Sequence, residues 1–239
     1  MGDTVRIKKK HVQMIAHRGL SGLERENTCA AFVAAGNRSY FGIETDIHKT
    51  KDGQFVVFHD DTTNRLTDSD WVVEEHTLAE LQALRLKDLD ENVRSDLLMP
   101  MLQDYIRICR KYCKTAVLEL KNPFQMKDIQ AIVELIRQEE WLQNTVFISF
   151  CLENLVHLRK LLPEQPIQYL VKEFSEEVKS NLIDYSFDLD IKYSNLSADQ
   201  VEDIHRLGRK INVWTVDNSQ VAELLIQMGV DYITTNILE

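Results

Sequence analysis

Ionisable side chains stand at the ends of short apolar stretches whose composition is that of β-strands. His17 follows the apolar residues 13–16, and Glu44 and Asp46 lie within the apolar segment 43–47. An unpaired charge beside a buried core is costly, so such groups are expected there only in the company of partners. Histidine together with carboxylates can perform acid–base chemistry or bind a metal ion. The pattern therefore indicates a reaction centre.

The spacing of the two carboxylates sharpens this interpretation. Glu44 and Asp46 are two residues apart, so on a strand their side chains point to the same face. They repel and raise each other's pKa unless a cation or a basic group offsets them. Asp52-Gly53, which lies between two strand-like runs, is typical of a hairpin turn. With these two residues as the turn, the register places His59 opposite Asp46, beside the carboxylate pair.

Strand-like runs alternate with helical patterns along the chain. The runs are 14–16, 43–47, 55–58, 116–120, 146–149, 167–171, 189–191, 211–216 and 232–234. The turn at 52–53 is too short for a parallel crossover, so one strand is expected to be antiparallel and eight remain for a parallel set. We therefore expect an α/β fold, a (β/α)₈ TIM barrel with a local β-hairpin after the second strand. A doubly wound open sheet is the alternative, but no Gly-x-Gly-x-x-Gly follows the first strand.

The polar stretch 60–100 interrupts this alternation. It contains one capped helical segment at 77–81. A long excursion at the catalytic end of a barrel is typical of a lid or a specificity loop. No linker or internal repeat divides the chain, so residues 1–239 are expected to form a single barrel domain that carries this inserted loop.

More charged residues fall at the carboxyl ends of the expected strands, where barrel enzymes carry their active sites. Glu119 and Lys121 repeat the same-face spacing of Glu44 and Asp46. Three converging carboxylates favour a hard divalent cation, Mg²⁺ or Ca²⁺, which prefers oxygen ligands. Zinc is disfavoured because no helical His-Glu-x-x-His occurs. Each residue alone also fits a structural role, such as a buried Glu119–Lys121 ion pair, but such roles do not explain why all gather at one end.

His48 shares the face of the carboxylate pair, but it lies nearer the hairpin tip, so we expect it to be solvated.

The composition limits the possible partners of the protein. A formal net charge of -10 argues against a nucleic-acid backbone as the main partner, since proteins that bind one are basic. No run approaches the roughly 18 apolar residues of a membrane span. Residues 1–10 lack the apolar core of a signal peptide, so a cytoplasmic location is expected.

Short motifs follow one another in a fixed order. They are Ile15-Ala16-His17-Arg18-Gly19, Glu26-Asn27-Thr28, Glu44-Thr45-Asp46, Lys51-Asp52-Gly53, Val57-Phe58-His59-Asp60, Pro100-Met101-Leu102, Leu118-Glu119-Leu120-Lys121, Ile148-Ser149-Phe150, Trp214-Thr215-Val216 and Gly229-Val230-Asp231-Tyr232-Ile233-Thr234. This series resembles the glycerophosphodiester phosphodiesterase family over essentially the whole chain. The resemblance implies a TIM-type barrel of the phospholipase C-like kind, a divalent metal, and hydrolysis of glycerophosphodiesters to glycerol 3-phosphate and an alcohol. The chain departs from the family at Arg25, commonly proline, and at Asp217 and Asn236, where Asn and Asp respectively are frequent.

The resemblance also implies roles for the charged residues. A phosphodiester is an anion that gains negative charge in its pentacoordinate transition state, so its hydrolysis needs cations at the phosphate oxygens. Glu44, Asp46 and Glu119 would hold the metal ion. Arg18 and Lys121 would add fixed positive charge for the substrate phosphate, and Arg18 could contact two oxygens at once.

The remaining roles concern proton transfer and the substrate pocket. His17 and His59 would share the acid and base duties, because imidazole titrates near neutral pH. The resemblance further suggests that the glycerol's own 2-hydroxyl attacks first and that water then opens a cyclic phosphate. Which histidine starts as the base stays open. We expect Asn27, Phe150 and Trp214 to line the substrate pocket.

Two other functions stay possible beside the hydrolysis of a small-molecule glycerophosphodiester. A related phosphodiesterase acting on lysophospholipids would need an apolar groove, for which Trp71-Val72-Val73 is the only hint. A non-catalytic barrel that binds phosphodiesters or a protein partner would be favoured by the loss of a histidine or carboxylate named above, and all of them are present.

Overall fold

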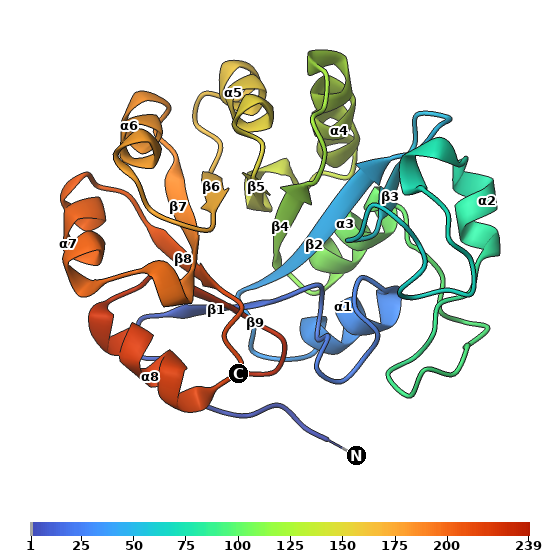
Figure 1. The fold of residues 1–239 in the computed structure, drawn as a ribbon, viewed down its shortest axis with the longest axis horizontal. Helices are drawn as coiled ribbons and strands as arrows, with labels where there is room; N and C mark the ends of the chain where they lie inside the picture. Colours follow the sequence, from blue (N-terminus) through green and yellow to red (C-terminus); the bar gives the residue numbers. More distant parts are fainter. Residues whose placement is uncertain (1) are drawn as a thin grey trace.

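Eight short apolar segments lie side by side as parallel strands in the computed structural model, which describes residues 2–239. They are β1 (Gln13–Ala16), β2 (Gly42–Lys49), β4 (Thr115–Leu120), β5 (Thr145–Ser149), β6 (Ile167–Val171), β7 (Asp188–Lys192), β8 (Ile211–Trp214) and β9 (Tyr232–Thr235). Strand β1 pairs with both β9 and β2, so the sheet closes on itself. The predicted (β/α)₈ barrel is confirmed (Figure 1).

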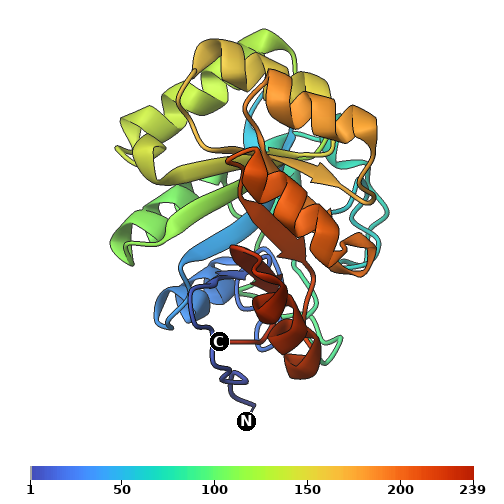
Figure 2. The same cartoon turned by 90° about the vertical axis from the view of Figure 1, so that its left-hand side faces the viewer.

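Helices connect successive strands of the barrel. They are α1 (Cys29–Gly36), α3 (Leu102–Lys111), α4 (Met126–Gln138), α5 (Leu152–Leu161), α6 (Glu176–Asp184), α7 (Ala198–Arg206) and α8 (Ser219–Met228), with short 3-10 helices η2 (Leu142–Asn144) and η3 (Tyr193–Asn195). Figures 1 and 2 show the helices outside the strands. Outward strand residues such as Ile43 and Leu118 share the main core with helix residues such as Phe32 and Tyr105. Burying these apolar faces against each other stabilises both layers.

The barrel interior has its own apolar cluster, separate from the main core. It consists of Ile15, Val117, Ile148 and Leu170, all nearly inaccessible. Because side chains alternate between the two faces of a strand, Glu119 points inward like Val117. The interior is therefore apolar around this cluster and charged towards the carboxyl ends of β2 and β4. On the side of β6, β8 and β9 it is polar, because the buried residues Gln168, Asn212 and Thr234 hydrogen bond to one another.

Strand β3 (Phe55–Val57) runs antiparallel to β2, which confirms the predicted hairpin. The predicted register is wrong by one residue. Ile47 pairs with Val57, and the Phe58 N–H donates to the Asp46 carbonyl oxygen at 3.1 Å, so Phe58 and not His59 lies opposite Asp46.

The cause of this shift is the hairpin loop. Its last ladder bond runs from the Thr50 N–H to the Gln54 carbonyl oxygen at 2.8 Å, which leaves residues 51–53 as a three-residue loop. Gly53 has φ +79°, in the left-handed region where glycine is favoured. Three-residue hairpin loops commonly place such a residue last, and Asp-Gly is compatible with both loop lengths.

The segment 60–100 folds against β3 and builds a small core of its own. It contains η1 (Val73–Glu75) and α2 (Leu78–Ala83), whose capping box is formed by Thr77 and Glu80. The shared apolar cluster consists of Val56, Phe58, Leu66, Val73, Leu81, Leu86, Leu97 and Met99. Figure 1 shows α2 and its flanking loops on one side of the barrel, beside β3. The insertion is thus a packed element of the fold.

The two ends of the described chain pair with each other. The Val5 N–H donates to the Ile237 carbonyl oxygen at 3.0 Å, and the Glu239 N–H donates to the Val5 carbonyl oxygen at 2.8 Å. Within residues 2–239, no helix is both long enough and apolar enough to cross a bilayer.

Candidate active site

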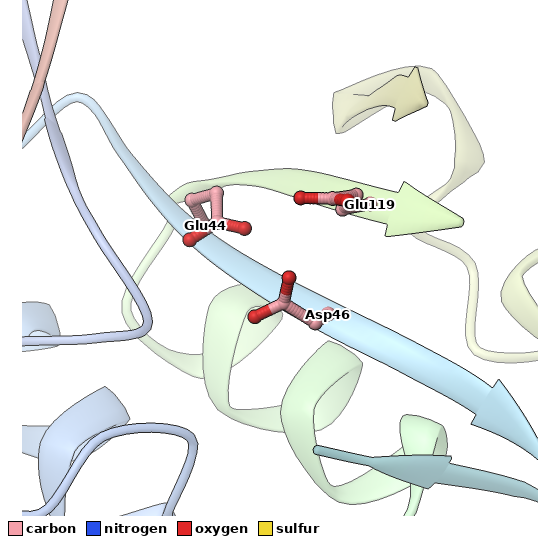
Figure 3. A group of neighbouring side chains, drawn as sticks. All are labelled: Glu44, Asp46 and Glu119. Atoms are coloured by element: carbon pink, nitrogen blue, oxygen red, sulfur yellow. The ribbon is translucent and has the colours of Figure 1, made fainter. Parts of the chain in front are cut away.

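Three buried carboxylates meet on two neighbouring strands. Glu44 and Asp46 come from β2 and Glu119 comes from β4, with Asp46 and Glu119 paired in register (Figure 3). One carboxylate oxygen from each lies within 4.8 Å of the others. All three are buried: the exposed fraction is 3% for Glu44, 1% for Asp46 and 7% for Glu119. The sequence-predicted acidic cluster is therefore brought together by the pairing of β2 with β4.

Burial and crowding set the protonation of this triad. Burial and the charge of Asp46 raise the pKa of Glu119 to about 8. Burial and the charges of both neighbours raise the pKa of Glu44 well above its usual range. Burial would also raise the pKa of Asp46, but the charges of Lys121 and Arg18 hold it well below its usual range. The triad thus holds one firm negative charge and two carboxyls that would ionise fully only beside additional positive charge.

Arg18 and Lys121 flank the triad. The Arg18 Nε lies 3.6 Å from the Asp46 Oδ2, and the Lys121 Nζ lies 3.0 Å from the Glu119 Oε1 and 3.4 Å from the Asp46 Oδ1. The backbone N–H of Arg18 donates to the Glu44 Oε2 at 2.8 Å. The ion pairs expected of a purely structural site are therefore present beside the acidic cluster.

Asn27 orients the Asp46 carboxylate through a hydrogen bond. Its Nδ2 donates to the Asp46 Oδ2 at 2.8 Å, and its Oδ1 accepts from the Thr45 hydroxyl at 2.8 Å. Asn27 is only 2% exposed and has φ +54°, a left-handed conformation that asparagine tolerates. The structure therefore places Asn27 beneath the site, where it orients Asp46, and not on the pocket wall, where we expected it.

His17 is held through its Nδ1 atom by a neutral amide. The Nδ1 lies 2.8 Å from the Asn236 Oδ1. The Asn236 Nδ2 donates to the Asp217 Oδ2 at 2.6 Å, and the Ser21 hydroxyl donates to the Asn236 Oδ1 at 2.6 Å, so this amide is oriented with its oxygen towards the histidine. The imidazole proton is thereby assigned to Nδ1, which leaves Nε2 as an acceptor. Burial and the charge of Arg18 lower the pKa of His17 to about 4.

His59 is held by a carboxylate. Its Nδ1 lies 2.6 Å from the Asp60 Oδ1, and the Arg65 Nε donates to the Asp60 Oδ2 at 2.6 Å. Arg65 also contacts both oxygens of Glu26, at 2.9 and 2.8 Å, and Glu26 pairs with the Arg18 Nη1 at 2.8 Å. A continuous chain of charges thus joins the insertion to the acidic triad. Burial lowers the pKa of His59, against the opposing pull of the Asp46 and Asp60 charges.

His48 contradicts its expected solvated role. It is 0% exposed, its Nε2 lies 3.3 Å from the His59 carbonyl oxygen, and its Nδ1 lies 3.3 Å from the Asn122 Nδ2. The hairpin tip at residues 51–54 is exposed, but Asn122 and, from the insertion, Glu74 cover the part of β2 that carries His48. His48 therefore supports the backbone of His59.

A cavity of about 110 Å³ opens over the triad. It is lined by His17, Arg18, Glu44, His59, Glu119, Ile148, Phe150, Leu170, Asp190, Trp214, Thr215 and Thr234. Phe150 and Trp214, predicted for the pocket, line it as an edge-to-face pair with ring centroids 5.8 Å apart. A larger cavity of about 670 Å³ lies at the amino ends of the strands, but no histidine lines it. The small cavity is the better candidate because it alone joins histidines, carboxylates and cations.

Sequence reasoning missed some of the residues that orient this site. Asp60 stood beside His59 in a quoted motif, which was a usable signal. Asp217 and Asn236 were noted only as departures from the family pattern, yet they are in contact with each other. Nothing in the sequence linked Arg65 to the site, because its contacts depend on how the insertion folds.

Comparison with known proteins gives a consistent result. The model of the glycerophosphoryl diester phosphodiesterase family matches residues 17–239. The protein YhdW of Bacillus subtilis is 31% identical over 230 residues, which cover 93% of each chain. A glycerophosphodiester phosphodiesterase of Caldanaerobacter subterraneus is 29% identical over 231 residues, again 93% of each chain. The structure of an Oleispira antarctica phosphodiesterase, in complex with the product sn-glycerol-3-phosphate, superposes with a TM-score of 0.86 at 31% identity and covers 94% of this chain and 92% of that chain. The chain therefore belongs to the glycerophosphoryl diester phosphodiesterase family.

Proposed function

We propose that this phosphodiesterase hydrolyses glycerophosphodiesters to glycerol 3-phosphate and an alcohol, with a divalent cation held by Glu44, Asp46 and Glu119. The observation that carries the proposal is the convergence of three buried carboxylates, with oxygens within 4.8 Å of one another, two of which, Glu44 and Glu119, line the cavity that His17 and His59 also line. The product bound to the Oleispira relative supports the choice of product.

The donor set of the triad fits a hard cation such as Mg²⁺ or Ca²⁺. All three groups are carboxylates, and the buried Asp46 Oδ1 accepts no hydrogen bond from the described residues. The raised pKa values of Glu44 and Glu119 mean that extra positive charge is needed to keep both groups ionised. The chemistry supplied by such an ion is Lewis-acid polarisation of a phosphate oxygen.

Arg18 and Lys121 are placed to bind the anionic substrate. Both lie against the triad, and 17% and 14% of their respective side chains remain exposed. Arg18 can offer two N–H groups to two phosphate oxygens, whereas Lys121 acts as a single positive charge. Their charges would stabilise the negative charge that develops in the transition state.

The two histidines differ in a way that assigns their first roles. His17 is held by a neutral amide oxygen, so its neutral form is favoured and its Nε2 can accept the proton of the attacking 2-hydroxyl. His59 is held by the Asp60 carboxylate, which opposes the lowering of the His59 pKa by burial, so His59 is the histidine better placed to carry the proton that the departing alkoxide takes up. Opening of the resulting cyclic phosphate by water reverses both transfers. Each histidine then ends the cycle in its starting state.

The insertion gives little support to a lysophospholipid substrate. In the segment Trp71-Val72-Val73, Val73 is 0% exposed within the insertion's core, and Trp71 stacks on His76 with ring centroids 4.4 Å apart. These contacts use two of the three apolar side chains that an acyl groove would need, and Val72 alone is exposed, at 39%. A small hydrophilic diester fits the cavity better.

The proposal is tested by measuring glycerol 3-phosphate release, coupled to its dehydrogenase, across a panel of glycerophosphodiesters and one lysophospholipid. Protein stripped by a chelator is compared with the same protein after addition of Mg²⁺ or Ca²⁺. We expect metal-dependent release from at least one glycerophosphodiester. Full activity after exhaustive chelation and dialysis would remove the metal assignment, and no release from any glycerophosphodiester would remove the substrate class.

A further inference from the structure

The cavity wall formed by β7 and β8 carries two buried polar atoms that find no partner among residues 2–239. Asp190 is 1% exposed, and its Oδ1 accepts no hydrogen bond. The Nε1–H of Trp214 donates to no acceptor. Buried polar atoms are almost always paired, so one orphaned acceptor and one orphaned donor in the same cavity indicate a ligand.

Asp190 and Trp214 lie on the side of the barrel opposite β2, so they could contact the end of a substrate that extends across the cavity from the triad. Asp190 pairs in register with Asn212, two residues before Trp214, so Asp190 and Trp214 are diagonal neighbours on the same inward face. In the closed order of strands, β7 lies four strands from β2 in either direction. The wall of Asp190 and Trp214 therefore faces Glu44 across the cavity that all three residues line.

The chemistry of the two atoms defines the group that they can bind. A phosphate oxygen of a diester cannot donate to a carboxylate, and a quaternary ammonium can neither donate nor accept a hydrogen bond. A hydroxyl can donate to the Asp190 Oδ1 and accept from the Trp214 Nε1 at the same time. Burial raises the pKa of Asp190 to about 7, and no cation contributes to this shift. The protein itself therefore leaves this carboxyl without a charged partner.

We propose that Asp190 and Trp214 bind the terminal hydroxyl of the substrate's glycerol arm and so select diesters of glycerol over diesters of shorter diols. The inference rests on the proposed function, in which the phosphate lies beside Arg18 and Lys121 and the 2-hydroxyl is the nucleophile. The terminal hydroxyl is then the one polar group of the arm without an assigned partner. A cavity of about 110 Å³ holds about four water volumes, which suits a three-carbon arm.

The test compares two substrates that differ only in this hydroxyl. Glycerophosphocholine and 2-hydroxyethyl phosphocholine both retain the hydroxyl next to the phosphoester, but only the first has the terminal hydroxymethyl group. We expect wild-type kcat/KM to favour glycerophosphocholine by about 10- to 100-fold, the range for a hydrogen bond to a charged or buried partner. Asp190→Ala and Trp214→Phe should each reduce this preference several-fold by lowering kcat/KM for glycerophosphocholine alone.

Asp188→Asn is the matched control. It removes a carboxylate from the same face of the same strand, but at the larger cavity at the opposite end of the barrel, so the substrate preference should stay unchanged. Thermal melts check that each variant is folded. Should Asp190→Ala not fold, Trp214→Phe carries the test, since it keeps the ring and removes only the N–H.

Two results would overturn the inference: equal wild-type kcat/KM for both diesters, or variants that slow both substrates by the same factor. A binding measurement separates these from a failure of the proposed function. Calorimetry of the metal-loaded protein should show tighter binding of sn-glycerol 3-phosphate than of 2-hydroxyethyl phosphate, and Asp190→Ala should lose that difference. If the wild type hydrolyses neither diester but shows this pattern, the proposed function fails and the hydroxyl site stands.

Discussion

The two histidines of the site are held through the same ring atom by partners of different charge. Asn236 presents an amide oxygen to His17, and Asp60 presents a carboxylate to His59. A neutral partner leaves an imidazole to act as a base, whereas an anionic partner stabilises the imidazolium. Under the proposed mechanism, these partners would assign the base role to His17 and the acid role to His59.

Loss of either imidazole should affect the rate more than the fold. His17→Ala and His59→Ala should each lower kcat by about 10²-fold or more, the usual contribution of a positioned proton-transfer group. Steady-state kinetics together with thermal melts provide the measurement. His11→Ala, at an exposed position, is the control and should keep wild-type turnover. If a variant at position 17 or 59 retained near wild-type kcat, the histidine at that position would have a structural role and not a catalytic one.

The partner of His17 can be changed with almost no change in shape. Asn236→Asp together with Asp217→Asn would place a carboxylate beside the Nδ1 and keep an amide at position 217 as its hydrogen-bond partner, which favours the imidazolium and raises the pKa of His17 above its present value of about 4. Because the base must be neutral, the acidic limb of the kcat/KM profile should move to higher pH, by about one unit or more. An unchanged acidic limb in this variant would contradict the assignment of His17 as the base.

At the residue scale, the sequence predicted which side chains gather but not how they are held. The same-face spacing of Glu44 and Asp46 was enough to place both on one wall. The contact between Asp217 and Asn236 joins two loops that follow different strands, and no local pattern reports such a contact. Asn27 was expected on the pocket wall because its motif adjoins the site, yet its side chain turns inward to Asp46.

Among the elements, the insertion 60–100 reaches the site through its contacts with Glu26 and Asp60. Its core packs on β3, and Arg65 extends from it to contact Asp60 and Glu26. Glu26 in turn pairs with Arg18. The insertion therefore contacts both the carboxylate that holds His59 and the partner of Arg18, the two groups proposed for proton transfer and phosphate binding.

This link predicts that Arg65→Ala reduces activity without destabilising the barrel. The arginine side chain is 42% exposed, so its ion pairs add little to the free energy of unfolding. Its loss should leave Asp60 and Glu26 less constrained and lower kcat by about tenfold, less than the roughly 10²-fold loss expected on removal of a proton-transfer group itself. Arg107→Ala, which breaks an exposed ion pair with Glu139 on the outer helices, should leave kcat unchanged. Equal kcat values in the two variants would show that the insertion does not position the acid.

At the scale of the elements, composition located the hairpin but not its register. Asp-Gly fits both two-residue and three-residue loops, and the choice shifts every pairing by one position. The capped helix at 77–81 was found because Thr77 and Glu80 form a local signal. The insertion's core was not foreseen, since its apolar residues are scattered through a polar segment and follow no single period.

Across the whole molecule, the eight-stranded closure brings buried charges together at one end of the barrel interior. Eight parallel strands with one antiparallel partner followed from counting strand-like runs and one short turn, and the structure confirms that count. The closed barrel was predictable because outward-facing residues repeat regularly and the crossovers are long enough for helices. The protonation of the triad was not predictable in the same way, because it depends on the burial that closure produces.

Metal binding to the triad should release protons. Because the pKa of Glu119 is raised to about 8, its carboxyl still holds a proton at pH 7 in the metal-free protein. Unfolding frees this carboxyl to ionise near its ordinary value, so metal-free stability should fall as the pH rises from about 4.5 to about 8. Metal affinity should rise over the upper part of the same range, by about tenfold per unit for each proton displaced.

Calorimetry in buffers of different ionisation enthalpy measures these protons directly. Glu119→Gln should bind metal more weakly and release fewer protons than the wild type. A wild-type affinity that does not change between pH 6 and pH 8 would show that the triad is already ionised or that the metal binds elsewhere.

The central claim is that Glu44, Asp46 and Glu119 form a cation site and not only a set of ion pairs with Arg18 and Lys121. Thermal melts of the wild type and of Asp46→Asn, each with and without Mg²⁺ or Ca²⁺, separate the two roles. The account predicts that metal raises the wild-type Tm by mass action, and that Asp46→Asn remains folded but loses both this rise and the activity. A variant that is strongly destabilised by its stranded cations, yet whose Tm still rises with metal as the wild type's does, would contradict it.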